Sequence, residues 1–464
     1  MNGWITFVLF GYVVLQFVIA AVAARFIKSE ADYLLAGRNL GIFTASMSLF
    51  ATWFGAETVM GTSGAVAASG LSGGRADPFG YTVCLVLMGL LLAYRMRVGR
   101  YVTVCDFFRE RFGPAAEKLS ACVMIPTSLF WAAAQILAFA SILSIITPFP
   151  LQISLLVTVF IVVGYSSIGG MIGDVVTDVV QGIVIAVGLA VLLFVVAGDA
   201  GGWTHAVSSI DPARLNIFPP DESRWAKIDS WAVPVIGSLV AQESLSRMLS
   251  TKTPQMARTA CMVGALIYFV VGLMPLLIGL MGRDLIPAPD ISDSFIPTLA
   301  KEVLPPALYA LFLGSLISAI LSTIDSALLS STALAGHNIV VPMFPDITER
   351  QKTQIERLLV VASGIFCCYV AMAGDSIFSL VEMASSFGSA GLVVCVLTGL
   401  YTKAGSLKAA VGTLAAGVIF SVLFDYVLGF DAPYLTSLAG CAIVYGAIAL
   451  YEKAKGKDQA VSLA

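Results

Sequence analysis

Residues 46–61 read Ser46-Met-Ser-Leu-Phe-Ala-Thr-Trp-Phe-Gly-Ala-Glu-Thr-Val-Met-Gly61 and lie within an apolar segment of about 42–69. Gly55 and Glu57 therefore fall near the middle of a segment that otherwise suits the hydrocarbon core of a bilayer. Irregular backbone survives at that depth only where it lines a cavity in the protein, and its freed carbonyls can then bind a cation. The stretch predicts an interrupted membrane helix beside a binding site.

The composition of the whole chain supports a membrane location. Of 464 residues, 58% are hydrophobic and 12% are charged, which is far from the composition of soluble globular proteins. Because each crossing segment must satisfy its own backbone hydrogen bonds in lipid, we predict an all-α integral membrane protein, a single domain over 1–464 with about 13 transmembrane helices. The segments span about 4–24, 42–69, 79–94, 116–146, 152–168, 172–197, 231–249, 257–281, 305–338, 355–373, 376–400, 406–424 and 434–451.

Several classes of function are disfavoured by the charge and the polar residue types. The net charge of −3 offers no basic surface for nucleic acid. The eight cysteines show no CxxC spacing, and the only histidines, His205 and His337, lie far apart, so a zinc site is not expected. No nucleophile with a base and an orienting group is apparent, so the chain is not expected to be an enzyme.

The positions of Lys and Arg predict the orientation in the membrane. Most of the 26 such residues fall in loops that become cytoplasmic if the N-terminus is outside the cell. An odd number of helices then places the C-terminus in the cytoplasm. We expect a multi-pass protein of the cell membrane, the inner membrane in a bacterium, with no obligatory protein partner.

A second apolar segment is also interrupted. It reads Ala232-Val-Pro-Val-Ile-Gly-Ser-Leu-Val-Ala-Gln-Glu-Ser244 and contains Pro234, Gly237 and Glu243. The two interrupted segments are the second and seventh of the thirteen, which is the spacing expected for two inverted five-helix halves. The predicted division is an additional N-terminal helix over 4–24, five-helix repeats over 42–197 and 231–400, and two C-terminal helices over 406–451.

A helix rich in hydroxyl groups follows at 316–332. Many of its serines can bond to the carbonyl one turn earlier, but Asp325 needs another explanation. Asp178 is a second carboxylate at membrane depth. Because we expect no Lys or Arg at comparable depth in the neighbouring segments, a bound cation such as Na⁺ is the simplest counter-charge.

Two glutamates, Glu57 and Glu243, lie just beyond the two breaks and are expected to face one cavity. They could bind a polar or cationic solute, bind protons, or cap a half-helix whose N-terminus favours negative charge. The aromatic residues Trp53, Tyr81 and Trp131 are weaker evidence for a binding site, because aromatic residues in membrane helices often serve packing or anchor the helix at the interface.

Several ordered motifs resemble the sodium:solute symporter family. The resemblance covers nearly the whole chain and implies a LeuT-type fold of ten core helices, with the first and sixth interrupted. The motifs are Ala36-Gly-Arg-Asn-Leu40, the stretch around Gly55, Gly169-Gly with Thr177-Asp-Val-Val-Gln181, and Ser318-Ala-Ile-Leu-Ser-Thr323.

The resemblance also implies cation sites. A sodium ion is expected between the carbonyls of Ala51 and Phe54 on one side and the carbonyl of Ala319 with the hydroxyls of Ser322 and Thr323 on the other. Some members hold a second sodium beside the first. That site would here draw on Asp178, Ser322 and Ser326, and Asp325 either strengthens it or shares a proton with Asp178.

Within the family, the motifs are most similar to the high-affinity choline transporters, where aromatic residues cage a quaternary ammonium. Ala241 replaces one cage tryptophan, so an amine or amino acid fits as well as choline does. The positions expected to face the solute are Trp53, Glu57, Thr58, Tyr81, Trp131, Gln135, Ala241 and Glu243.

The resulting expectation is a sodium-coupled symporter that imports a small polar organic solute by alternating access. A choline-like or other organic cation or zwitterion is the first candidate, and a proline-type amino acid or pantothenate is the alternative. A membrane sensor built on a transporter scaffold and a channel are the rival classes.

Overall fold

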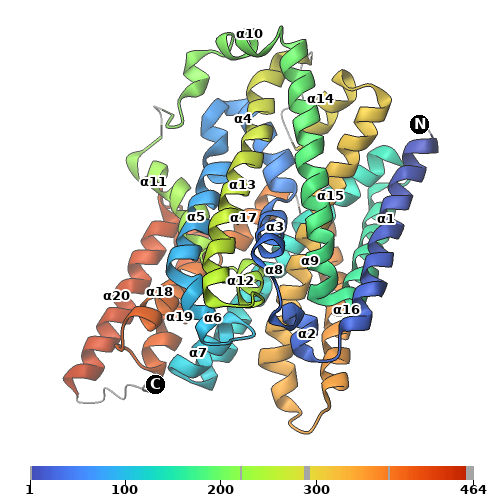
Figure 1. Cartoon of the computed structure of the whole chain (residues 1–464). Coiled ribbons are helices and arrows are strands. Elements are labelled where there is room, and N and C mark those ends of the chain that lie inside the picture. Colours follow the sequence, from blue (N-terminus) through green and yellow to red (C-terminus); the bar gives the residue numbers. More distant parts are fainter. Residues whose placement is uncertain (1–2, 220–221, 287–292, 375–376, 456–464) are drawn as a thin grey trace.

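The computed structural model describes residues 3–219, 222–286, 293–374 and 377–455, and these are helical apart from turns and loops. The ends of the predicted domain, 1–2 and 456–464, and residue 376 lie outside this description. The chain forms a bundle of helices that run mostly in one direction or its opposite (Figure 1). The α-helices are α1 Gly3–Ala23, α2 Glu30–Leu35, α3 Ile42–Trp53, α4 Thr62–Ser69, α5 Tyr81–Leu87, α6 Tyr94–Val98, α7 Val104–Phe112, α8 Pro114–Ile146, α9 Leu151–Asp199, α10 Trp203–Ser208, α11 Arg224–Ala232, α12 Gln242–Leu249, α13 Pro254–Gly282, α14 Phe295–Val303, α15 Pro306–Ala335, α16 Glu349–Ala373, α17 Ile377–Ser386, α18 Ser389–Tyr401, α19 Leu407–Ser421 and α20 Pro433–Ala454.

Nine helical spans within the described residues are long and apolar enough to cross a membrane. They are Glu57–Val98, Pro114–Ile146, Leu151–Asp199, Pro254–Leu285, Pro306–Met343, Glu349–Ala373, Ala384–Tyr401, Leu407–Val427 and Pro433–Ala454. Two shorter apolar helices, Phe10–Phe26 and Ile42–Trp53, accompany them. The all-α membrane architecture is therefore confirmed, but several of the thirteen predicted segments are joined or broken in the structure.

Two pairs of predicted segments lie within single helical spans. The segments 152–168 and 172–197 both belong to α9, which bends at Gly170, where φ is +51° and ψ is −159°. The end of 42–69 continues through short π-helical and 3-10 turns into 79–94, within the span Glu57–Val98. A hydropathy pattern counts apolar runs, and it does not show whether the chain between two runs stays helical.

Local sequence explains where several long helices begin. Proline occupies the first position of α8, α13, α15 and α20, where its fixed φ suits a helix and no hydrogen bond to its nitrogen is needed. The hydroxyl of Thr253 also accepts from the backbone N–H of Met256 at 3.2 Å and caps α13.

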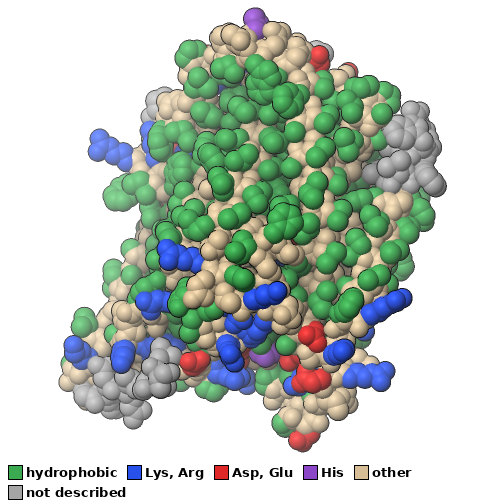
Figure 2. All heavy atoms as spheres, in the orientation of Figure 1, with side chains coloured by type: hydrophobic (Ala, Val, Ile, Leu, Met, Phe, Trp, Pro, Cys, Tyr) green, Lys and Arg blue, Asp and Glu red, His purple; other side chains and the backbone are tan. Residues whose placement is uncertain are grey.

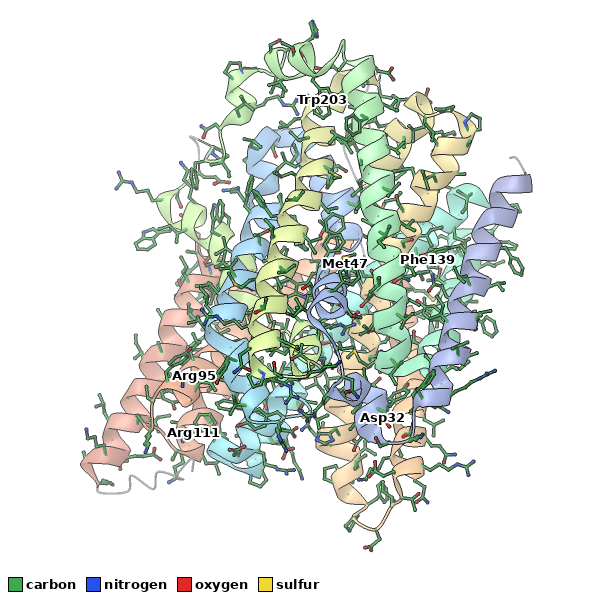
Figure 3. All side chains as sticks on the ribbon, viewed as in Figure 1. Asp32, Met47, Arg95, Arg111, Phe139 and Trp203 are labelled. Atoms are coloured by element: carbon green, nitrogen blue, oxygen red, sulfur yellow. The ribbon has the colours of Figure 1, made fainter. Side chains whose placement is uncertain are left out.

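The helix α15 lies at the centre of the bundle, packed along α9 and α8. Every side chain from Ser315 to Leu334 is buried, so its hydroxyl groups face protein and not lipid. The short helix α3 packs against α13 and α9, and Met47 marks its place in the middle of the molecule (Figure 3). This arrangement brings both predicted ligand segments into the core.

Both predicted interruptions are present. The helix α3 ends at Trp53, Phe54 has φ −87° and ψ 67°, and helical geometry resumes at Glu57 as a π-helical turn. In the second segment, a π-helical turn ends at Gly237 and α12 begins only at Gln242.

The outer surface separates apolar from charged side chains. Hydrophobic side chains cover the upper and middle part of the face in Figure 2, and Lys and Arg gather towards the lower end. Arg95 and Arg111 lie at that end, whereas Trp203 lies at the other (Figure 3). Arg95 is 4.1 Å from the ring centroid of Tyr401, and Arg111 donates to the carbonyl of Ala404 at 2.9 Å.

The bend at Gly170 yields a stability prediction. A Cβ at this residue would lie 2.6 Å from the ring of Tyr33 and 2.8 Å from its carbonyl oxygen, in a backbone conformation that side chains rarely adopt. We expect Gly170→Ala to cost at least about 1–3 kcal/mol. The measurement is the fraction of monodisperse protein that survives heating in detergent.

The control is Gly198→Ala in the same helix, because nothing lies within 4 Å of a Cβ there. That variant should match or slightly exceed the parent protein, by about 0.5–1 kcal/mol. Equal heat resistance of the two variants would show that the bend at Gly170 does not need glycine.

Candidate functional site

A cavity with about 650 Å³ of empty space, open solvent included, lies beside the two helix breaks. Its walls come from the end of α3, from α5, α8, α17 and α18, and from the chain around the start of α12. It is lined by Trp53, Glu57, Tyr81, Met124, Thr127, Ser128, Trp131, Gly237, Ser238, Val240, Ala241, Gln242, Glu243, Ala384, Ser385, Ser389 and Leu392. Both interrupted segments thus meet at one cavity.

Three aromatic residues share this cavity, as the sequence predicts. The rings of Trp53 and Tyr81 pack edge to face, with centroids 5.6 Å apart and an interplanar angle of 64°. Trp131 lines the wall formed by α8. The negative ring faces of such residues attract cations.

Glu57 is held by donors from α8. The indole Nε1 of Trp131 donates to its Oε1 at 2.8 Å, and the amide Nε2 of Gln135 donates to its Oε2 at 2.5 Å. The amide oxygen of Gln135 in turn accepts from the backbone N–H of Ala56 at 2.8 Å. Gln135 therefore fastens both the broken backbone and the carboxylate to α8, although it does not itself line the cavity.

Glu243 lies in the first turn of α12, where the helix N-terminus favours negative charge. The hydroxyl of Ser128, on α8, donates to its Oε1. Glu243 and Glu57 thus approach one cavity from the two interrupted segments, and both are held by neutral groups of α8.

The structure and the sequence differ on several lining residues. Thr58 does not line the cavity: its hydroxyl hydrogen-bonds to Asp77 at 3.2 Å and to the hydroxyl of Tyr268 at 3.0 Å. Ser128 and the hydroxyls of α17 and α18 were not predicted. Ser238 and Gln242 stood within the interrupted stretch and could have been named, but Ser385 and Ser389 carry no local signal.

Predicted sodium ligands come together between α3 and α15. The hydroxyl oxygen of Ser322 lies 2.9 Å from the carbonyl oxygens of both Ala51 and Ala319, so its one proton is directed at these two acceptors. The hydroxyl of Thr323 donates to the carbonyl of Ala319 at 3.1 Å. A Cβ on Gly55 would lie 2.9 Å from the Thr323 hydroxyl, so the break that begins at Phe54 lies against α15.

The expectation that no Lys or Arg reaches this depth is wrong. Arg247, on α12, has a fully buried side chain that forms an ion pair with Asp174 and lies 3.7 Å from Asp178. It also donates to the hydroxyls of Ser326 and Ser48. Arg247 lies near the end of the predicted segment 231–249, and it reaches the core because α12 starts only after the break, at Gln242.

The two predicted aspartates are held separately. The hydroxyl of Ser48 donates to Asp178 Oδ2, and the hydroxyl of Ser166 donates to Asp325 Oδ1, both at 2.5 Å. Within the described residues, the other oxygen of each carboxylate is buried without a hydrogen-bond partner. Ser326 joins this group through Arg247, so the predicted second cation site already contains a guanidinium.

This cluster yields a second stability prediction. Arg247→Met removes the positive charge and leaves Asp174 and Asp178 as uncompensated buried carboxylates. We expect a loss of about 3–5 kcal/mol, measured as lower resistance to heating in detergent.

The matched control is Arg258→Met, because Arg258 is exposed on the adjacent α13. Adding Asp174→Asn to Arg247→Met should restore part of the loss, since it removes one of the unpaired charges. If Arg247→Met were as heat-resistant as Arg258→Met, the ion pairs would not stabilise the fold.

Comparison with known proteins identifies this architecture. The high-affinity choline transporter 1 of Caenorhabditis elegans is 26% identical over 437 residues, covering 86% of this chain and 73% of the relative. The human high-affinity choline transporter 1 is 25% identical over 415 residues, covering 85% and 71%. The solved substrate-bound, outward-open state of a Na⁺-coupled sialic acid symporter is 16% identical, covers 97% of both chains and has a TM-score of 0.85, which shows a common fold.

The predicted LeuT-type fold is thereby confirmed. The family model of the sodium:solute symporters matches residues 33–417, which is most of the chain. This protein therefore belongs to the sodium:solute symporter family.

Proposed function

We propose that this protein is a sodium-coupled symporter that imports a small organic cation or zwitterion, with a choline-like solute as the first candidate. One observation carries the proposal: the cavity at the two helix breaks combines aromatic rings with two carboxylates. No Lys or Arg is among the described residues that line it. A carboxylate solute such as pantothenate lacks a positive partner there, and is the weaker alternative.

The sodium ion binds between α3 and α15 in this proposal. Carbonyls of Ala51, Phe54 and Ala319 and hydroxyls of Ser322 and Thr323 provide the oxygen ligands, which suit a hard cation. When sodium binds, the hydroxyl groups keep their protons but turn them away from these carbonyls, so that hydroxyl and carbonyl oxygens all face the ion. The ion then joins the broken helix to the central one. Because the same break forms one wall of the cavity, sodium binding and solute binding stabilise each other.

The site at Asp178, Ser326 and Asp325 stays a prediction for a second sodium ion or a proton. Arg247 already supplies one positive charge to Asp174 and Asp178. The simplest cycle therefore uses one sodium ion, bound at the first site.

The choice of solute depends on the cavity wall. A cation over the faces of Trp53, Tyr81 or Trp131 gains about 0.5–2 kcal/mol from each ring. Ala241 adds no ring at its position, and this favours an amine or a proline-type amino acid more than in the choline transporters. The alternative classes are a transporter-derived sensor and a channel. They differ from a symporter because in neither of them does sodium drive accumulation of the solute.

We also propose the orientation and the internal division of the chain. The N-terminus lies outside and the C-terminus in the cytoplasm of a cell-membrane protein, since Lys and Arg gather towards one end (Figure 2). The inverted five-helix halves are 42–197 and 231–400, flanked by 4–24 and by 406–451. α1 begins in the upper part of the bundle and α20 stops at the lower end, which supports opposite sides for the two termini (Figure 1).

Uptake into proteoliposomes tests the proposal. With an inward sodium gradient, a panel of choline, betaine, proline, simple amines and pantothenate should reveal saturable uptake of a cation or zwitterion that collapses when the gradient is removed. Flux independent of a gradient would favour a channel, and binding without flux would favour a sensor.

The sodium ligands are tested by the double variant Ser322→Ala/Thr323→Ala. Two lost oxygen ligands should raise the sodium concentration for half-maximal uptake by about tenfold or more, which corresponds to about 1.4 kcal/mol or more. Ser331→Ala is the control, because this buried hydroxyl of α15 bonds to the carbonyl of Leu328 at 2.9 Å, two turns away from the site. An unchanged sodium dependence in the double variant would remove these residues from the site.

A further inference from the structure

We propose that the preferred solute is a short alkyl diamine, bound with one ammonium group at Glu57 and the other at Glu243. This inference rests on the proposed function and names its substrate more narrowly. It starts from the presence of two carboxylates in one cavity, one at each helix break.

The first step is the balance of charge. The groups that hold the two carboxylates are the indole of Trp131, the amide of Gln135 and the hydroxyl of Ser128, and all three are neutral. The guanidinium of Arg247 donates to the backbone carbonyl of Glu243 at 3.1 Å and forms its ion pair with Asp174. Among the described residues it makes no salt bridge to the Glu243 carboxylate. Two buried carboxylates thus face the solute with no salt bridge to either among the described residues, and a solute with two positive charges balances both when they are ionised.

The second step is hydrogen bonding. An ionised carboxylate has about four acceptor positions. Glu57 receives two side-chain donors from α8, and Glu243 receives one, from Ser128. Each carboxylate also accepts from its own backbone N–H. The acceptor positions that remain suit N–H donors of a solute, which primary ammonium groups carry and quaternary ammonium groups lack.

The third step is the shape of the aromatic wall. The indole N–H of Trp131 is used to hold Glu57. Ala241, two residues before Glu243 in the chain, lines the cavity without an aromatic ring. A closed aromatic cage around one bulky head group is therefore incomplete. Elsewhere in the lining of the same cavity, Met124, Val240 and Leu392 offer apolar contact to a chain of methylene groups.

The test is sodium-driven uptake in proteoliposomes that contain the whole protein. Radiolabelled 1,4-diaminobutane competes with unlabelled diamines of three to six methylene groups, with butylamine, with choline and with the fully N-methylated, bis-quaternary diamine. We expect one chain length to compete best, because the two carboxylates are fixed. Butylamine, choline and the bis-quaternary compound should each compete at least about tenfold more weakly, since each forfeits one charge pair or its N–H bonds.

Single variants assign the two ends. Glu57→Gln and Glu243→Gln should each reduce diamine uptake by at least tenfold and bring the diamine and butylamine to similar potency. Ser141→Ala, which removes a hydroxyl of α8 that bonds to the carbonyl of Leu137 at 2.8 Å and does not line the cavity, should keep the preference for the diamine. Because the preference is a ratio measured within one preparation, a variant that inserts poorly changes the amount of uptake and not the ratio.

The outcomes separate this inference from the proposed function. Sodium-driven uptake of choline, proline or butylamine with no preference for any diamine would overturn the diamine assignment and leave the symporter intact. A diamine preference that persists in both glutamine variants would overturn the assignment of its two ends. Absence of sodium-driven uptake for every compound would overturn the proposed function itself.

Discussion

A helix that breaks inside a bilayer frees backbone groups that lipid cannot satisfy, and the rest of this structure depends on how they are satisfied. At the break after α3, Ser322 donates to the carbonyl of Ala51, and Gln135 accepts from the N–H of Ala56. These partners belong to α15 and α8, two long helices of the core. The break is therefore held from both sides, and Gly55 provides the close approach that a Cβ would prevent.

The buried carboxylates fall into two groups, which differ in whether a positive side chain lies beside them. Asp174 and Asp178 face Arg247, a cation that belongs to the protein. Glu57 and Glu243 are held by neutral donors and face the cavity. Because a buried carboxylate is costly when it lacks a counter-charge, loss of Arg247 is expected to destabilise the first group. The second group has no such partner in a salt bridge among the described residues, and in our proposal a cationic solute supplies the counter-charge.

Comparison with the relatives separates the backbone fold, which is shared, from the side chains, which vary. A common fold with the sialic acid symporter persists at 16% identity, so the scaffold tolerates extensive change of side chains. Selectivity then depends on the few residues that line the cavity. In this chain those residues include Ala241 and two glutamates at the breaks, and they give the cavity a negative and only partly aromatic wall.

The sequence by itself determined the membrane class, both helix breaks, the hydroxyl-rich helix, and the meeting of Trp53, Tyr81 and Trp131 with the two glutamates. These features follow from composition, from glycine and proline, and from family motifs, all of which are local in the chain. Only the tertiary structure decided that Arg247 lies beside Asp174, that Thr58 turns away from the cavity, and that α17 and α18 complete its wall. Such contacts join residues far apart in sequence, and the depth of Arg247 depends on where α12 starts after its break. A hydropathy pattern shows neither these long-range contacts nor the residue at which α12 starts, because it describes each segment without its neighbours.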